Sequence, residues 1–251
     1  MEKKKTNSFP PKQHGRHHRF LLMMCALLLV LLGLFIGSVA VSLHRIKTGG
    51  LSQFRKAASS SFTRSGSASS AAPHVERSQV EESVAPSLGP SDAPLTIVEF
   101  GDFDCPYTQA SLFTVKQMLQ EFPGKFRLLF RNFPIPSLHP TAEHAAEAAM
   151  CANDQHKFWE YYDLLLLSPG QRTDGALVSF AQQLGINTDA FQACLANTPN
   201  AATIQRDMSV GLQSGVEGTP TWFFNGYRIE GALSVDNFRK VVQLGVAGKL
   251  K

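Results

Sequence analysis

The chain has 251 residues, a formal net charge of +4, 43% hydrophobic residues and 18% charged residues, which excludes a generally disordered chain and a polytopic membrane protein. The charge is uneven, because residues 1–50 carry eight Lys or Arg and one acidic residue, whereas residues 91–251 carry twelve basic and sixteen acidic residues. The C-terminal part is therefore mildly acidic, and we expect no nucleic-acid partner.

An uncharged apolar segment occupies residues 20–43, FLLMMCALLLVLLGLFIGSVAVSL. A helix of this length spans about 36 Å, more than the roughly 30 Å hydrocarbon core of a bilayer. Six Lys or Arg precede the segment and two follow it before residue 50. This positive-inside bias predicts a basic cytoplasmic tail over 1–19 and a single-pass signal-anchor over 20–43 of an inner or plasma membrane.

A cleaved signal peptide is the alternative to a retained anchor. The small residues Ser38-Val39-Ala40 suit a cleavage site, but the apolar region of a signal peptide runs for about 7–15 residues and this one is longer. Both interpretations place the remainder in an extracytoplasmic, periplasm-like space, where disulfides persist. Residues 44–87, rich in Ser and Ala, then form a flexible linker.

The folded domain is expected over residues 88–251. The apolar run LTIVEF at 95–100 is typical of a buried strand, and Pro106 suits the first turn of a helix that ends near Glu121. The later elements are a strand at 125–133, a long helical stretch at 140–167, helices at 173–184, 188–196 and 200–214, a hairpin around Asn225-Gly226, and a helix at 234–247. This order predicts an α/β sheet with a helical insertion, about 138–214, between its two halves.

Cys105 lies between the first strand and the helix that begins at Pro106. The free amides and the dipole at a helix N-terminus favour an anion, and the thiolate is the nucleophilic form of cysteine. The position therefore favours a reactive thiol. The alternative is a buried cysteine that acts as a small, inert apolar residue.

Several segments together resemble the DsbA-like branch of the thioredoxin superfamily. They are LGPSDAPLTIVEF, GDFDCPYT, RNFPIPSLHP, AAEAAMCANDQHKFWEYYDLLL, FQACL and GTPTWFFNG, and they fall within residues 88–251. The resemblance implies a thioredoxin fold with a helical insertion and no cofactor. It also implies that the protein acts on extracytoplasmic protein thiols or disulfides.

The resemblance assigns roles to individual residues. Cys105 is implied as the nucleophile and Pro220 as a cis-proline beside it, with the backbone of Thr219 offered to a bound peptide. Pro106 and Tyr107 are implied in substrate binding. Glu99 stands where the family carries a buried acid near the sulfur, which acts in proton transfer; the alternative is a partly exposed carboxylate at a strand end.

Thr108 replaces the second cysteine of the family's C-x-x-C motif, since the chain reads Cys105-Pro106-Tyr107-Thr108. A mixed disulfide at Cys105 then has no internal thiol to release it. We expect one-thiol chemistry, in which an external thiol or the substrate's own thiol resolves the adduct, with the Thr108 hydroxyl as a hydrogen-bond donor to the thiolate.

A redox-inactive module is the alternative function. It would bind peptides, or act as a chaperone, through a groove formed by Pro220 and the aromatic residues Phe103 and Tyr107. Cys151 and Cys194 form an even pair outside the cytoplasm, which favours a structural disulfide, and DsbA-like relatives often carry such a pair; two buried free thiols remain the alternative. We expect no metal site.

Overall fold

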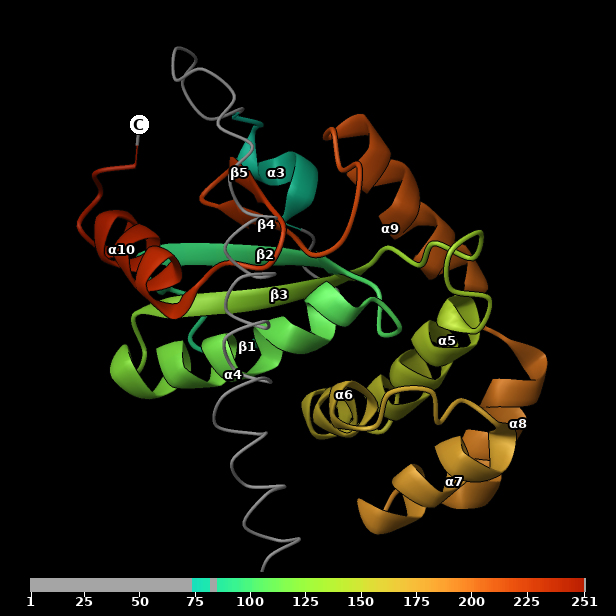
Figure 1. Ribbon diagram of the computed structural model, residues 1–251. Coiled ribbons are helices and arrows are strands. Elements are labelled where there is room, and N and C mark those ends of the chain that lie inside the picture. Colours follow the sequence, from blue (N-terminus) through green and yellow to red (C-terminus); the bar gives the residue numbers. More distant parts are fainter. Residues whose placement is uncertain (1–73, 82–84, 251) are drawn as a thin grey trace, which may run out of the picture. The chain divides into compact units, whose positions relative to one another are not determined.

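The computed structural model describes residues 74–81 and 85–250. Their five-stranded sheet has the order β1-β3-β2-β4-β5, in which β2 and β3 run parallel and the other neighbours run antiparallel. The α/β sheet expected from the sequence is thus confirmed, and the structure shows that it is a mixed sheet (Figure 1). The strands are β1 (Ser87–Leu88), β2 (Leu95–Gly101), β3 (Phe126–Asn132), β4 (Thr221–Phe224) and β5 (Tyr227–Glu230).

Helices cover both faces of the sheet (Figure 1). They are α3 (Arg77–Val80), α4 (Pro106–Glu121), α5 (Ala142–Asn153), α6 (Phe158–Leu167), α7 (Asp174–Gln183), α8 (Thr188–Asn197), α9 (Ala201–Gln213) and α10 (Val235–Val246). Side chains of alternate residues of β2 lie on opposite faces of the sheet. Leu95 and Ile97 pack with apolar residues of α4 and α10, while Val98 and Phe100 pack with those of α3 and α9. Burial on both faces explains the continuous apolar run of this strand.

The helical insertion has an apolar core of its own, built by α5, α6, α7 and α8. Phe103 and Phe130 extend this core toward the sheet, so that the insertion and the sheet share one packed interior. A buried ion pair fixes α9 on β3, because Arg131 Nε donates to Asp207 Oδ1 over 2.8 Å. The other oxygen of Asp207 accepts the backbone N–H of Asn132 at 3.0 Å.

Two parts of the structure differ from the expected elements. The helical stretch at 140–167 is divided between α5 and α6 by a turn in which His156 takes a positive φ of 60°. Described residues before the expected start at residue 88 also pack on the domain. His74 pairs with Tyr227 in a β-bridge, and Val80 is fully buried. Val75 and Ala85 pack against the same apolar cluster as Val80, although the composition of the segment is mainly polar.

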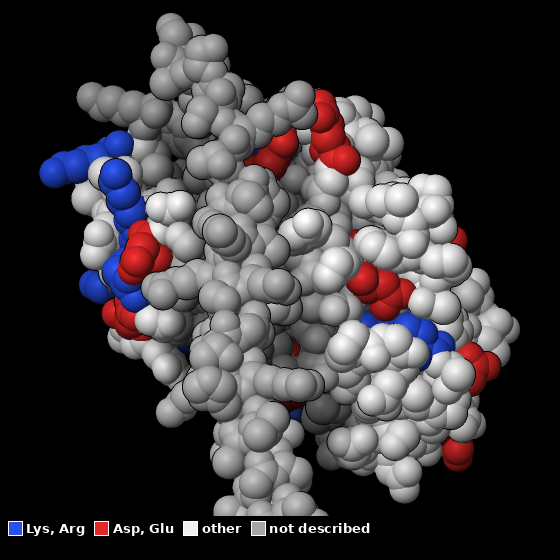
Figure 2. Space-filling model, viewed as in Figure 1, with Lys and Arg blue, Asp and Glu red and all other residues white. Residues whose placement is uncertain are grey.

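Basic and acidic side chains lie close together on the face shown in Figure 2. An ion pair joins α10 to α4, since Arg239 contacts Glu121 at 2.6 Å, and Arg239 also contacts Asp236 of α10 at 2.6 Å. Among residues 74–81 and 85–250, no helix combines the length and apolarity needed to span a membrane. The expected anchor at 20–43 lies outside the described residues.

Candidate active site

Cys105 is the N-cap of α4, directly after the loop that leaves β2. Pro106 occupies the first turn, where a proline costs no hydrogen bond. The Cys105 backbone N–H donates to the carbonyl of Asp102 at 3.1 Å, and its own carbonyl accepts from Gln109 at 3.0 Å. Cys105 is 5% exposed, and it is the one free cysteine among the described residues. The thiol thus lies at the positive end of a helix in a nearly closed site.

The structure brings Cys105 together with Thr219 and Pro220, which are far away in the sequence. Cys105 Sγ donates a hydrogen bond to the Thr219 carbonyl oxygen over 3.1 Å. The Thr219–Pro220 peptide bond is cis, and β4 begins directly afterwards. Thr219 is 8% exposed, and its Oγ1 has no hydrogen-bond partner among the described residues.

Thr108 is completely buried one helical turn after Cys105. Its Oγ1 has no hydrogen-bond partner within the described part of the chain. The hydrogen bond expected between Thr108 and Cys105 is therefore not formed in this structure. A short β-branched side chain here fills the interior without supplying the second thiol.

The two aromatic residues beside Cys105 lie in different environments. Tyr107 is 56% exposed, so its ring is available to a partner at the rim of the site. Phe103 is only 1% exposed, and its ring packs against Phe130 and Tyr162 at centroid distances of 5.1 and 5.8 Å. The expectation that Phe103 lines a surface groove is wrong, because its side chain belongs to the core.

Glu99 is fully buried in β2, which excludes the partly exposed alternative. Tyr162 of α6 donates a hydrogen bond to Glu99 Oε2 over 2.9 Å, whereas Oε1 has no hydrogen-bond partner among the described residues. Burial raises the pKa of Glu99 to about 8, against the opposing effect of the Tyr162 hydrogen bond. The carboxyl group thus titrates near neutral pH. The pKa of Tyr162 lies well above 10, first because of burial and then because of Glu99.

Two side-chain pairs that the sequence analysis did not assign hold the loop before Cys105. Asp102 Oδ2 lies 2.8 Å from His139 Nδ1, and Arg172 Nε donates to Asp104 Oδ1 over 2.7 Å. His139 and Arg172 both come from the helical insertion, His139 near its start and Arg172 between α6 and α7. Only their acidic partners stand near Cys105 in the sequence, so no local pattern indicates these pairs.

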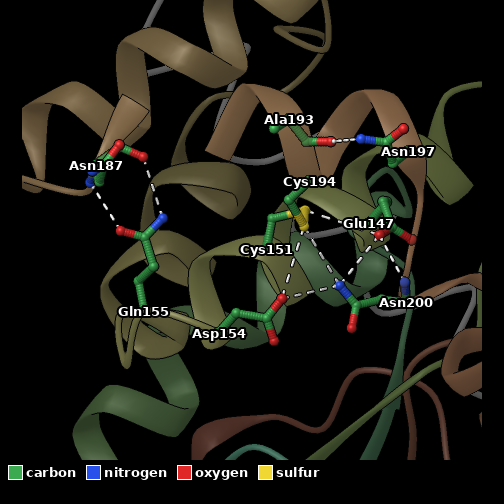
Figure 3. Close-up of a disulfide and its surroundings, with 9 residues drawn as sticks. All are labelled: Glu147, Cys151, Asp154, Gln155, Asn187, Ala193, Cys194, Asn197 and Asn200. Carbon is green, nitrogen blue, oxygen red and sulfur yellow. Dashed lines mark hydrogen bonds between the residues drawn. A yellow bond between two sulfur atoms is a disulfide. The ribbon is translucent and has the colours of Figure 1, made fainter. Parts of the chain in front are cut away.

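Cys151 and Cys194 are joined by a disulfide with an S–S distance of 2.01 Å, which links α5 to α8 (Figure 3). Glu147 lies beside it, with one carboxylate oxygen within 4.8 Å of both sulfurs. Asn200 Nδ2 donates to Glu147 Oε1 at 3.2 Å and to Asp154 Oδ2 at 3.4 Å. Because metal binding requires thiolates, the sulfurs of the intact disulfide supply no metal site.

The model of the Thioredoxin family matches residues 81–243, which include Glu99, Cys105, Pro220 and the disulfide. A probable disulfide bond formation protein D from Bacillus anthracis is 31% identical over 150 residues, which are 56% of this chain and 69% of that protein. A Na(+)/H(+) antiporter NhaA 1 from Salinispora arenicola is 39% identical over 160 residues, which are 64% of this chain and 24% of that protein. The chain thus spans about a quarter of the length of such antiporters.

Solved structures give the same fold. A thioredoxin-like oxidoreductase from Silicibacter pomeroyi superposes with a TM-score of 0.60 and 26% identity, covering 67% of this chain and 96% of that one. BdbD from Bacillus subtilis superposes with a TM-score of 0.61 and 21% identity, covering 71% of this chain and 98% of that one. The expected thioredoxin-like fold is therefore confirmed.

Proposed function

The chain belongs to the DsbA-like branch of the thioredoxin family of thiol-disulfide oxidoreductases, and from this premise we propose that it exchanges disulfides of extracytoplasmic proteins through Cys105 alone. The observation that carries the proposal is the contact between the Cys105 thiol and the Thr219 carbonyl, 3.1 Å apart. The free thiol at the N-terminus of α4 lies beside the backbone of Thr219, and we propose that this backbone receives a bound peptide. Thr108, in place of a second cysteine, limits the chemistry to one thiol.

The exchange requires two substitutions at sulfur. The Cys105 thiolate attacks a substrate disulfide, forms a mixed disulfide with one sulfur and releases the other as a thiolate. A second thiolate then attacks the mixed disulfide and restores the Cys105 thiolate. If it belongs to the substrate, the disulfide is rearranged without net electron transfer. If an external thiol attacks, and a second external thiol completes a disulfide with it, two electrons pass to the substrate.

Glu99 is proposed to exchange protons with the site. Its pKa of about 8 means that it is mostly protonated but readily ionised near neutral pH. A carboxylate can accept the proton that Cys105 loses before attack, and the acid can return a proton to a departing thiolate. Glu99 Oε1, which has no hydrogen-bond partner among the described residues, is free for this transfer. Tyr162 fixes the orientation of the group through the other oxygen.

Turnover of a peptide disulfide tests the proposal. The full chain in detergent is incubated with a peptide that contains one disulfide, with and without added glutathione. We expect consumption of the peptide disulfide to accelerate when both the chain and glutathione are present, and Cys105→Ser to remove the acceleration. Cys25→Ser is the matched control, because it removes a cysteine from residues 20–43 and leaves Cys105 in place. Equal rates with the chain and with its Cys105→Ser variant contradict the proposal.

We further propose that residues 20–43 anchor the chain and that the domain lies outside the membrane. The support is the uncharged segment with its excess of Lys and Arg on the N-terminal side. Protease added to cells whose outer barrier has been opened should digest the C-terminal domain while the inner membrane remains sealed. Protection of the domain under these conditions contradicts this topology, and a mature N-terminus at Val41 indicates cleavage instead.

A redox-inactive peptide-binding module is the second candidate. Thr108 favours it, because the usual release step is missing, and the exposed Tyr107 is available for contact with a peptide. The two functions give different results for two variants. In a binding module, Cys105→Ser leaves partner affinity unchanged and Tyr107→Ala weakens it. In the one-thiol enzyme, Cys105→Ser abolishes exchange.

A further inference from the structure

Arg172 is a buried arginine whose side chain is 2% exposed. It lies in the loop between α6 and α7. Its guanidinium group donates to Asp104 Oδ1 at 2.7 Å and to the Phe103 carbonyl at 3.1 Å. It also donates to three carbonyls at the end of α6 and in the following loop, those of Leu165, Ser168 and Gln171. One side chain thus joins the helical insertion to the two residues that precede Cys105.

Asp104 is the centre of this connection. Its Oδ1 accepts a hydrogen bond from Arg172 Nε, and its Oδ2 accepts a hydrogen bond of 2.6 Å from the Thr141 hydroxyl. The side chain is only 12% exposed, so water screens its charge weakly. A carboxylate next to a thiolate in the sequence opposes the ionisation of that thiol. The guanidinium of Arg172 offsets this charge at hydrogen-bonding distance.

We propose that Arg172 is a positioning residue for Cys105, which fixes the loop of residues 102–105 to the helical insertion and neutralises Asp104 so that the Cys105 thiolate can form. This inference rests on the proposed function, because it concerns the reactivity of the proposed nucleophile. The inference goes further than the proposed function in one respect. The helical insertion controls the reactivity of Cys105 through Arg172, in the loop between α6 and α7. Arg172 itself acts through Asp104 and the backbone of Phe103.

Other titratable groups also surround the Cys105 loop, so the test must separate Arg172 from them. They are Glu99 on β2, bonded to Tyr162 of α6; Asp102 in the loop, bonded to His139; Tyr107 on α4; and Glu217 before Thr219. Substitutions at Arg172 and Asp104 leave all of these side chains in place. If both substitutions shift the pH profile of Cys105 reactivity in the same direction, the cause is disturbance of the loop. If they shift the profile in opposite directions, the cause is charge.

The charges predict opposite effects for two substitutions. Arg172→Met leaves the Asp104 carboxylate without a cationic partner, so the pH profile of Cys105 reactivity should move upward by about one pH unit. Asp104→Asn keeps the side-chain shape and removes the negative charge that balances the guanidinium, so the profile should move downward by a similar amount. The double variant should return close to the wild-type profile. A role limited to holding the loop would not give shifts of opposite sign.

The experiment measures the rate of alkylation of Cys105 by iodoacetamide between pH 5 and 9 in the full chain. Mass spectrometry of the Cys105 peptide separates this signal from that of Cys25. The matched control is Arg239→Met, which removes an arginine that also pairs with two carboxylates, on α10. Its pH profile should equal that of the wild type. If Arg172→Met does not fold, Asp104→Asn alone still carries the test, through its downward shift.

The outcomes separate this inference from the proposed function. Opposite shifts for the two single variants support the inference. A reactive wild-type Cys105 with unchanged profiles in both variants, or with shifts in the same direction, overturns the inference and leaves the proposed function standing. A wild-type Cys105 that is alkylated only after unfolding overturns both.

Discussion

The thiol of Cys105 and the backbone carbonyl of Thr219 are joined by a hydrogen bond of 3.1 Å, although 114 positions separate the two residues in the chain. Only the protonated thiol can donate this bond. Ionisation of Cys105 therefore frees the Thr219 carbonyl, which can then accept an N–H group of a peptide. The pairing links the protonation state of Cys105, the proposed nucleophile, to the availability of the Thr219 carbonyl.

Thr108→Cys should restore an internal resolving thiol. Position 108 is buried one helical turn after Cys105, within the Cα distance that a disulfide can bridge. We expect mixed disulfides at Cys105 to decay at least about tenfold faster in this variant, because an intramolecular thiol replaces a bimolecular attack. Intact-mass measurements at successive times after adduct formation record the decay.

Thr108→Ser is the matched control for that prediction. It keeps a small polar side chain at the buried position and adds no thiol, so its adduct should last as long as that of the wild type. An adduct of equal lifetime in Thr108→Cys and Thr108→Ser would show that position 108 does not face the mixed disulfide.

Glu99→Gln should change how stability depends on pH. The folded-state pKa of Glu99 is raised by burial from 4.5 to about 8. The folded chain therefore keeps a proton that the unfolded chain releases, so this contribution to stability is complete below about pH 4.5 and is lost as the pH rises toward 8. Glutamine stays neutral throughout. Relative to the wild type, the free energy of unfolding of Glu99→Gln should rise between pH 5 and 8.

The size of this effect is a few kcal/mol at most, since each pH unit in the interval contributes up to about 1.4 kcal/mol. Chemical unfolding at several pH values measures it, and the difference between the two proteins removes the contribution of the other groups. A constant difference from pH 5 to 8 would show that Glu99 is ionised in the folded chain.

The disulfide should stabilise the domain without affecting Cys105. Cys151 and Cys194 are 43 positions apart, and a loop of this length contributes about 4 kcal/mol in the chain-entropy model, less any native-state strain. The double substitution of both cysteines by alanine should lower the free energy of unfolding by up to this amount and leave the rate of Cys105 alkylation unchanged. Denaturation of both proteins measures the difference. Alkylation of both thiols in the denatured, unreduced wild type would show that no disulfide is present.

Local patterns in the sequence are sufficient to predict the helices, strands and turns around the site. The apolar run in β2 and the proline after Cys105 predicted the strand and the helix, whose observed ranges are Leu95–Gly101 and Pro106–Glu121. The turn at Asn225-Gly226 was also visible, because both residues take positive φ values, 47° and 91°, which these two residue types accept readily. These features depend on residues that are neighbours in the sequence, so a local sequence pattern can predict them.

The contacts that complete the site depend on residues distant in the sequence. Arg172 reads as an ordinary loop arginine until the fold places it against Asp104. No residue near Tyr162 in the sequence indicates that its hydroxyl donates a hydrogen bond to Glu99. Phe103 is expected in a surface groove in the binding-module alternative, yet its ring packs against Phe130 of β3 and Tyr162 of the insertion. The side a loop residue faces is decided by tertiary packing, which no spacing in the sequence encodes.

The most direct test of one-thiol chemistry is the fate of a mixed disulfide at Cys105. The native full chain is mixed with a peptide that contains a single disulfide, and peptide mapping without reduction locates the adduct. We predict an adduct on Cys105 that persists until an external thiol is added, whereupon the free chain and the released peptide thiol return together. A chain whose Cys105 forms no adduct when native, but reacts fully once unfolded, would contradict the proposed function.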